Sequence, residues 1–193
     1  MKKLLLLFAF TATVSVSPAA IIQFDLIGTG GPGLLFTSEP GVLSGGSGGE
    51  VAGGINFDTV SKQLTINVAW GSASGFTNLT GNATNAHVHG TANDFGNGGA
   101  GNWLQTGGVI FGLTGAPFTY NSSASAGSIL GTSAALTAAQ EAALMGSRYY
   151  INVHTAANGG GEIRGFLTPV PEPSAALAGL TALGALALRR RRA

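Results

Sequence analysis

The sequence predicts an all-β fold: an antiparallel β-sandwich with Greek-key-like connections and one short helix, between two terminal segments of a different kind. Three observations support this fold class. Glycine accounts for 32 of the 193 residues. Only 9% of the residues are charged, against about 25% in an average soluble domain. Apolar residues alternate with polar ones over short runs, the period of a half-buried strand, and Gly-rich turns separate these runs.

The predicted strands follow one another with turn signals between them, as in an all-β domain. Leu64–Trp70 is the clearest, because its apolar residues fall on one face while Thr65, Asn67 and Ala69 fall on the other. A preceding run that ends at Asp58 alternates in the same way, so we expect the two to pair as a hairpin. In chain order the strands are Ile21–Ile27, a short one near Gly33–Thr37, the run ending at Asp58, Leu64–Trp70, Ala86–His89, Val109–Leu113, Tyr149–His154 and Glu162–Leu167.

One helix is predicted inside the domain, over Leu136–Met145. Thr137 followed by Gln140 is the pattern of a capping box, the interior is rich in Ala, and Gly146 suits the C′ position. Gly45–Gly49 fits the pattern Gly-x-Ser-x-Gly but lacks the strand–turn–helix setting of a nucleophile elbow, so we interpret it as a linker. The predicted loops are residues 28–49, 71–85, 91–105 and 118–128.

The first 19 residues have the parts of a secretory signal peptide. Lys2 and Lys3 open the chain, an apolar run follows at Leu4–Phe10, and small residues surround Ser17–Ala19. The alternative is a membrane anchor, but the apolar run is too short and too interrupted to span a bilayer well. We therefore expect signal peptidase to remove residues 1–19 and the domain to occupy residues 20–168.

Residues 169–193 form a C-terminal segment with three parts in order. Pro171, Glu172 and Pro173 come first, and the prolines end the preceding strand. An apolar helical stretch follows at Ala175–Leu188, and a basic cluster closes the chain. By the positive-inside rule this basic end stays in the cytoplasm. The cluster consists of Arg189, Arg190, Arg191 and Arg192.

This C-terminal segment resembles the PEP-CTERM sorting signal of Gram-negative bacteria. The resemblance implies recognition by an exosortase and a transmembrane sorting helix that holds the protein in the inner membrane for a time. It also implies delivery to the cell surface or an exopolysaccharide matrix. The alternative is a plain C-terminal anchor, and with either one the domain is exported.

Charge is segregated along the chain, which limits the possible partners. The net charge is +1, but most basic residues lie at the two ends. Residues 20–168 carry three basic side chains against seven acidic ones, a net charge of −4. Such a domain cannot neutralise phosphates, so we expect no nucleic-acid partner. The chain has no Cys, which excludes disulfides, thiolate metal sites and a thiol nucleophile.

Several stretches of the domain carry a family resemblance. They are Ala86-His87-Val88-His89-Gly90, the predicted helix, Tyr150–Thr155 and Gly160–Gly165. Together they resemble the CHRD domain, which is named for chordin and is common in exported bacterial proteins. The resemblance covers roughly residues 21–167, with a small departure at Gly159, where the family often has Pro. It implies an extracellular β domain and no known reaction.

All three histidines of the chain fall within these stretches, and they are the candidate metal ligands. His87 and His89 are two residues apart on a strand and therefore point to the same face. If this strand lies beside the Tyr149–His154 strand, both imidazoles meet His154, and the following turn brings Glu162 close. Neutral imidazoles suit copper or zinc. The pattern His-x-His resembles the start of the copper site of copper–zinc superoxide dismutase, but no further His exists for a second metal.

The sequence favours a structural interpretation of the same residues. The histidines can hydrogen-bond loop backbones and Glu162, and so order Gly-rich loops that have few other contacts. Arg148, Glu162 and Arg164 can form a buried or half-buried network that specifies loop geometry without catalysing anything. We predict no catalytic residues and no cofactor, unless the histidines bind copper or zinc.

The sequence therefore predicts an exported, surface-sorted and non-catalytic module, structural or binding in function, of the cell envelope or the exopolysaccharide matrix. The alternative is an extracytoplasmic copper- or zinc-binding protein, or a metalloenzyme, that uses the three histidines. Expected partners are signal peptidase and an exosortase during processing, and the inner membrane before it. After processing we expect exopolysaccharide or surface proteins as partners.

Overall fold

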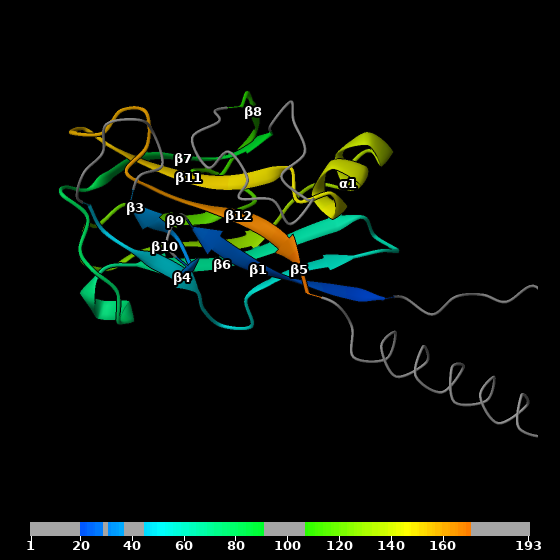
Figure 1. Ribbon diagram of the computed structural model, residues 1–193, viewed down its shortest axis with the longest axis horizontal. Helices are drawn as coiled ribbons and strands as arrows, with labels where there is room; N and C mark the ends of the chain where they lie inside the picture. The colour runs from blue at the N-terminus through cyan, green and yellow to red at the C-terminus, as the bar shows by residue number, and fades with distance from the viewer. Residues whose placement is uncertain (1–19, 29–30, 37–44, 91–106, 171–193) are drawn as a thin grey trace, which may run out of the picture.

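The computed structural model describes residues 20–28, 31–36, 45–90 and 107–170, which form a β-rich domain with one short α-helix (Figure 1). The predicted all-β class with one helix is confirmed. The first strands are β1 (Ile21–Gly28), β2 (Gly31–Pro32), β3 (Leu35–Phe36), β4 (Gly48–Glu50), β5 (Ile55–Asp58) and β6 (Gln63–Trp70), followed by the short 3₁₀ helix η1 (Ser72–Ser74). The remaining elements are β7 (Ala83–Gly90), β8 (Val109–Gly112), β9 (Thr119–Asn121), β10 (Gly127–Thr132), α1 (Ala138–Met145), β11 (Tyr149–Thr155) and β12 (Ile163–Pro169).

The strands form a single antiparallel sheet that curls on itself. Its main order is β8-β7-β11-β12-β1-β5-β6-β10-β9, with β2, β3 and β4 paired to β1, β12 and β6. An antiparallel β-sandwich with Greek-key-like connections was predicted; the structure has one curled sheet in which β1 joins the two halves. The first half of β1, Ile21–Phe24, pairs with β5, and its second half, Phe24–Ile27, pairs with β12. One strand therefore passes from one layer to the other.

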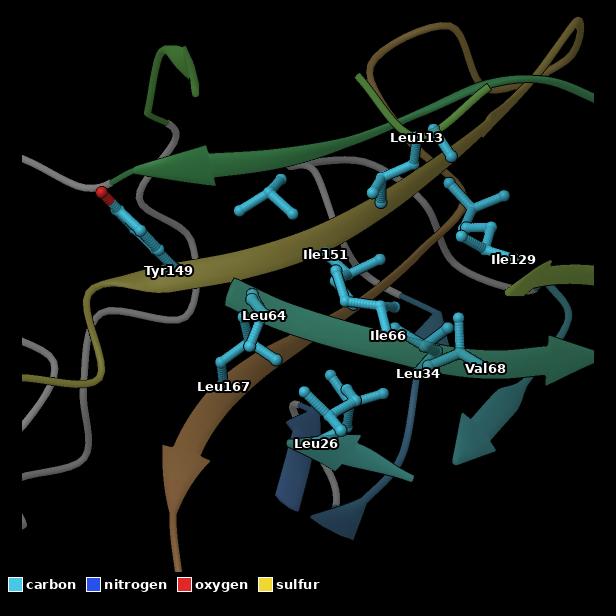
Figure 2. Close-up of a cluster of buried hydrophobic side chains, with 14 of the residues drawn as sticks. Leu26, Leu34, Leu64, Ile66, Val68, Leu113, Ile129, Tyr149, Ile151 and Leu167 are labelled. Atoms are coloured by element: carbon cyan, nitrogen blue, oxygen red, sulfur yellow. The ribbon is translucent and has the colours of Figure 1, made fainter. Parts of the chain in front are cut away.

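The core lies between the two halves of this curled sheet. Figure 2 shows Ile151 of β11 turned toward Leu64 and Ile66 of β6, with Leu26 and Leu167 in the same buried layer. The predicted apolar face of β6 is confirmed, because its four apolar side chains have no exposed surface. The predicted hairpin is confirmed as well, since β5 pairs with β6. Burial of the apolar surface of both layers is the main driving force for the fold.

The capping box and the last residue of helix α1, Met145, are as predicted, but the helix begins at Ala138 rather than Leu136 and its C-terminal cap differs. The Thr137 hydroxyl accepts a hydrogen bond from the backbone N–H of Gln140, and the Gln140 side chain accepts one from the N–H of Thr137, which completes the capping box. Gly146 was expected at C′, the position with positive φ. Gly146 has φ −82°, and it is Ser147, with φ 54°, that takes the left-handed conformation. The N–H groups of Ser147 and Arg148 bond the carbonyls of Leu144 and Ala143, the Schellman pattern.

Two predictions about the loops were wrong, and one predicted strand is more exposed than its apolar residues indicate. Val109–Leu113 was predicted to be a strand and forms β8, but β8 lies at the edge of the sheet and Val109 is 54% exposed. The stretch 118–128 was expected to be a loop, but it contains β9 and the start of β10. Gly45–Gly49 was interpreted as a linker, yet Gly48 and Gly49 belong to β4 and pair with β6.

The terminal predictions lie outside the described residues. The signal peptide at residues 1–19 and the sorting segment from Pro171 onward therefore stay predictions. Among the residues that the structure does describe, none of the helices has the length and apolar character needed to cross a membrane.

Candidate metal centre

Strands β7, β11 and β12 form the layer that carries the candidate site. Residues 85–90 of β7 pair in register with β11: His87 lies opposite Asn152, and His89 opposite Tyr150. Paired residues of antiparallel strands point to the same side, so the layer has two distinct faces. The inner face, which includes Val88, packs on the core. The outer face carries the histidines. Strand β11 is covered on this face as well as on the inner one, because all of its residues are buried.

The three imidazoles come together on this outer face. One nitrogen from each of His87, His89 and His154 can be chosen so that all three lie within 4.8 Å of one another. The shortest separation is 3.1 Å, from His87 Nδ1 to His154 Nε2. The predicted meeting of the His-x-His strand with His154 is therefore confirmed as geometry. Two nitrogens bound to one tetrahedral Zn²⁺ at 2.0–2.1 Å lie about 3.3 Å apart, so no pair of these nitrogens has to approach by more than roughly 1.5 Å on binding.

Backbone carbonyls define the tautomers of two of these rings. His89 Nδ1 lies 2.9 Å from the carbonyl oxygen of Gly107, and His154 Nδ1 lies 3.0 Å from that of Gly159. A carbonyl only accepts, so both Nδ1 atoms carry a proton and donate it. Both Nε2 atoms are then acceptors: that of His154 accepts the 3.1 Å hydrogen bond from His87 Nδ1, and that of His89 has no hydrogen-bond partner among the described residues. A metal-binding histidine typically donates its other N–H to a carbonyl or carboxylate in this way.

The electrostatics of the outer face keep the histidines neutral. Burial lowers the pKa of all three imidazoles below the ordinary value of 6.5. For His154, the neighbouring imidazoles lower the pKa further, while its bond to Gly159 partly raises it. For His89, the positive charge of Arg164 adds to the lowering. A neutral imidazole is the form that binds a metal, so the site is in its ligand state at neutral pH.

Aromatic and cationic groups support His89 from the β11 side. The His89 ring stacks on the Tyr150 ring, with centroids 5.0 Å apart and planes within 9° of parallel. The Tyr150 hydroxyl accepts a hydrogen bond of 3.0 Å from the N–H of Gly107, the residue whose carbonyl holds His89. Arg164 lies 4.8 Å from the Tyr150 centroid and 5.5 Å from that of Phe166, within the range of cation–π contacts. These contacts restrict the His89 ring to one orientation.

The predicted carboxylate, Glu162, has a different role from the histidines. It is fully buried, and its two oxygens accept five hydrogen bonds from loop residues. The donors are the N–H groups of Gly46 and Thr80, the hydroxyls of Thr80 and Thr155, and the amide of Asn158. Burial alone would raise its pKa, but the bonds from Thr80, Thr155 and Gly46 outweigh it and hold the pKa below the ordinary value.

Glu162 therefore organises the loop that holds His154. Its oxygens tie together the segment at Gly46, the segment at Thr80 and the hairpin loop between β11 and β12. That hairpin loop supplies the Gly159 carbonyl to His154. The predicted loop-ordering role of the histidines agrees with the bonds of His89 and His154 to loop carbonyls. The proposed network of Arg148, Glu162 and Arg164 stays a prediction.

Sequence reasoning missed two residues that shape the site. Asn152 is buried between the histidines and the loop, and its amide donates to the Gly160 carbonyl. Gly161 has φ 125°, and a Cβ there would overlap the Asn152 side chain. The Gly-rich stretch after β11 was a visible signal for such a close approach. The carbonyls of Gly107 and Gly159 left no signal, because any residue supplies one.

Comparisons with known proteins give one match. The family model described as the CHRD domain matches residues 36–167, which is more than half of the chain. The matched range contains all three histidines, Glu162 and the β11–β12 hairpin. No curated protein matches the chain, and no solved structure does.

Proposed function

This chain belongs to the CHRD domain family, and from that premise we propose that it is an exported, surface-sorted, non-catalytic module that binds one copper or zinc ion. The ligands of this ion are His87, His89 and His154. The module works in the cell envelope or in the exopolysaccharide matrix outside it.

The observation that carries the metal assignment is that imidazole nitrogens with acceptor lone pairs lie close together. The Nε2 atoms of His89 and His154 are left as acceptors by the bonds of their Nδ1 atoms to backbone carbonyls. The His89 Nε2 atom is buried and has no hydrogen-bond partner among the described residues. A buried acceptor without a partner costs about 1–3 kcal/mol, and a bound ion removes that cost. A purely loop-ordering role for the histidines does not require this atom to be buried.

The donor set indicates which ions fit. Three imidazoles with no thiolate and no carboxylate among the described ligands suit zinc and copper. They do not suit calcium or magnesium, which take oxygen ligands. By the general order of affinities, Cu²⁺ binds more tightly than Zn²⁺ to the same nitrogen site. The ion that occupies the site is then decided by which of the two is available outside the cell membrane.

Export and sorting rest on the two terminal segments. Residues 1–19 have the basic start and apolar run of a signal peptide, and residues 171–193 have the three parts of a PEP-CTERM segment. Signal peptidase and an exosortase are the expected processing partners, and the inner membrane holds the chain before processing. Exopolysaccharide or surface proteins are the expected partners afterwards.

Metal analysis of the exported protein tests the proposed function. The protein is isolated without chelators from the envelope fraction of an expressing Gram-negative host, and its copper and zinc are counted per chain. We expect one ion per chain, and loss of that ion in His89→Ala and in His154→Ala. Asn85→Ala is the matched control, because Asn85 pairs with His154 on the same face but is not a ligand. Absence of stoichiometric metal from the wild-type protein contradicts the metal assignment.

A deletion tests the sorting part separately. Removal of residues 171–193 leaves the whole described domain in place. We expect the truncated protein to lose its association with the inner membrane and the cell surface and to collect in the soluble exported fraction. If it fractionates as the full chain does, the segment is not a sorting signal.

A further inference from the structure

The three histidines are held very unequally. His89 and His154 each donate to a backbone carbonyl, and His89 also stacks on Tyr150. The His154 side chain is 9% exposed, and the His89 Nε2 atom is buried. His87 and His89 are both half-buried, but the hydrogen bond that the structure gives the His87 ring goes to His154, another member of the cluster, and not to the backbone. Two ligands are therefore fixed by the protein, and the third is oriented only by its neighbours.

The described residues leave the space around His87 open on one side. Strand β8 pairs with β7 so that Gly112 lies opposite His87, and paired residues point to the same face. Gly112 is exposed, and a Cβ built on it would meet no atom of the described residues within 4 Å. β8 is also the last strand on its side of the sheet. On the other side of His87 lies Asn152, which is fully buried. Among the described residues, the open approach to the cluster is at Gly112.

We infer, resting on the metal binding proposed above, that His87 is the exchangeable ligand, and that the ion enters and leaves on the Gly112 side. An acceptor that offers its own nitrogen or oxygen ligands takes the ion there. The bond from His87 to the ion breaks as the first bond to the acceptor forms, while His89 and His154 still hold the ion. The oxidation state of the ion does not change. The site is thus built to hand its ion to a chelating partner rather than to retain it as a permanent structural ion.

Ligand-exchange kinetics test this inference. The exported protein is loaded with Zn²⁺, mixed with excess of the chelator 4-(2-pyridylazo)resorcinol, and the formation of the coloured complex is followed in time. Loss of an outer-shell partner of a metal ligand already weakens affinity 10–100-fold, so loss of a ligand costs at least as much. We expect His87→Ala to retain Zn²⁺ but to release it about tenfold faster or more. His89→Ala and His154→Ala should fail to retain it.

A second variant adds a barrier instead of removing a ligand. Gly112→Val places a β-branched side chain beside His87, and Gly112 has no left-handed backbone angle that would strain it. A barrier on the side that the described residues leave open slows entry and exit alike, so we expect release slower by about threefold or more with an unchanged dissociation constant. Gly115→Val is the matched control, because Gly115 is also exposed and open but lies in the turn beyond β8. It should leave the release rate unchanged.

The outcomes separate this inference from the proposed function. If wild-type protein binds neither Zn²⁺ nor Cu²⁺, both are wrong. If it binds Zn²⁺ but His87→Ala loses it as completely as His89→Ala does, the metal site stands and the exchange role of His87 is refuted. If Gly112→Val releases Zn²⁺ at the wild-type rate, the ion does not pass on the Gly112 side. Slower release in Gly112→Val, with no change in Gly115→Val, supports the inference.

Discussion

Replacing Glu162 by Gln removes the charge at the centre of the loop network without changing the shape of the side chain. In the structure one carboxylate oxygen accepts from the N–H of Gly46 at 3.0 Å and of Thr80 at 2.8 Å. The other accepts from the Thr80 hydroxyl at 2.6 Å, the Thr155 hydroxyl at 2.7 Å and the Asn158 amide at 3.1 Å. A Gln amide keeps one acceptor oxygen, so an N–H₂ group then faces three donors.

The expected loss of stability follows from these contacts. Hydrogen bonds to a charged group contribute about 1.5–3 kcal/mol each, and three of them are disturbed. The Thr80 and Thr155 hydroxyls can rotate and accept from the new N–H₂ group, which recovers part of that loss, but the Asn158 amide cannot. We therefore expect Glu162→Gln to lower the free energy of unfolding by about 2–4 kcal/mol. That is a large share of the roughly 5–15 kcal/mol of a typical domain.

Denaturant unfolding at neutral pH measures this change, with Glu141→Gln as the control. Glu141 forms a 2.9 Å ion pair with Lys62 at the surface, so its loss should cost no more than about 1 kcal/mol. Metal affinity should fall along with stability, by about 10–100-fold, because Gly159 in the same loop holds His154. If Glu162→Gln destabilises the protein no more than Glu141→Gln does, the carboxylate does not organise the loops.

The remaining predictions concern pH and two backbone positions. The pKa of Glu162 is lower in the folded chain than its ordinary 4.5, so the unfolded chain takes up the proton first as pH falls. The stabilisation that the Glu162 carboxylate gives the fold should be complete above about pH 4.5 and lost as pH falls through the folded-state pKa. In Glu162→Gln, the free energy of unfolding should therefore fall less on acidification than it does in the wild-type protein. Ser147→Gly should stabilise the fold by about 0.5–1 kcal/mol, since Ser147 has φ 54°, and an unchanged or lower melting temperature would contradict this. Gly161→Ala should lower the free energy of unfolding by about 2 kcal/mol or more, because Gly161 has φ 125° and Asn152 occupies the space of the new methyl group. A variant as stable as the wild-type protein would contradict this, since the loop would then have moved to make room.

Some of the fold was predictable because the pattern was strong. The alternation in β6 predicted both its strand and its buried face, and the capping box predicted the start of α1. β10 was missed because only Ile129 and Leu130 of its six residues are large and apolar. Gly127 stands where the Trp70 indole lies against the backbone, so a packing requirement removed the side chain that would have marked the strand. The joining of two layers by β1 depends on tertiary pairing and leaves no local pattern.

The candidate site shows the same division. The spacing of His87 and His89, and the hairpin after His154, predicted which side chains would meet. The sequence did not predict which nitrogen of each ring would carry the proton. The proton position is set by the backbone carbonyls of Gly107 and Gly159, and any residue type supplies a carbonyl. Glu162 was predicted to lie close to His154 and to help specify loop geometry, but the donors that it binds at Gly46, Thr80, Thr155 and Asn158 were not predicted. The side chains of the site could therefore be predicted from the sequence, and the backbone groups that orient these side chains could not.

X-ray absorption at the metal edge of the exported protein tests the metal assignment most directly. With one Zn²⁺ bound per chain, we expect a first shell dominated by nitrogen at about 2.0–2.1 Å, with the outer-shell scattering of imidazole rings. Three rings should be required to describe the wild-type signal, and two for the His87→Ala protein. A shell of oxygen ligands without imidazole scattering would contradict the account, because the ion would then lie away from His87, His89 and His154.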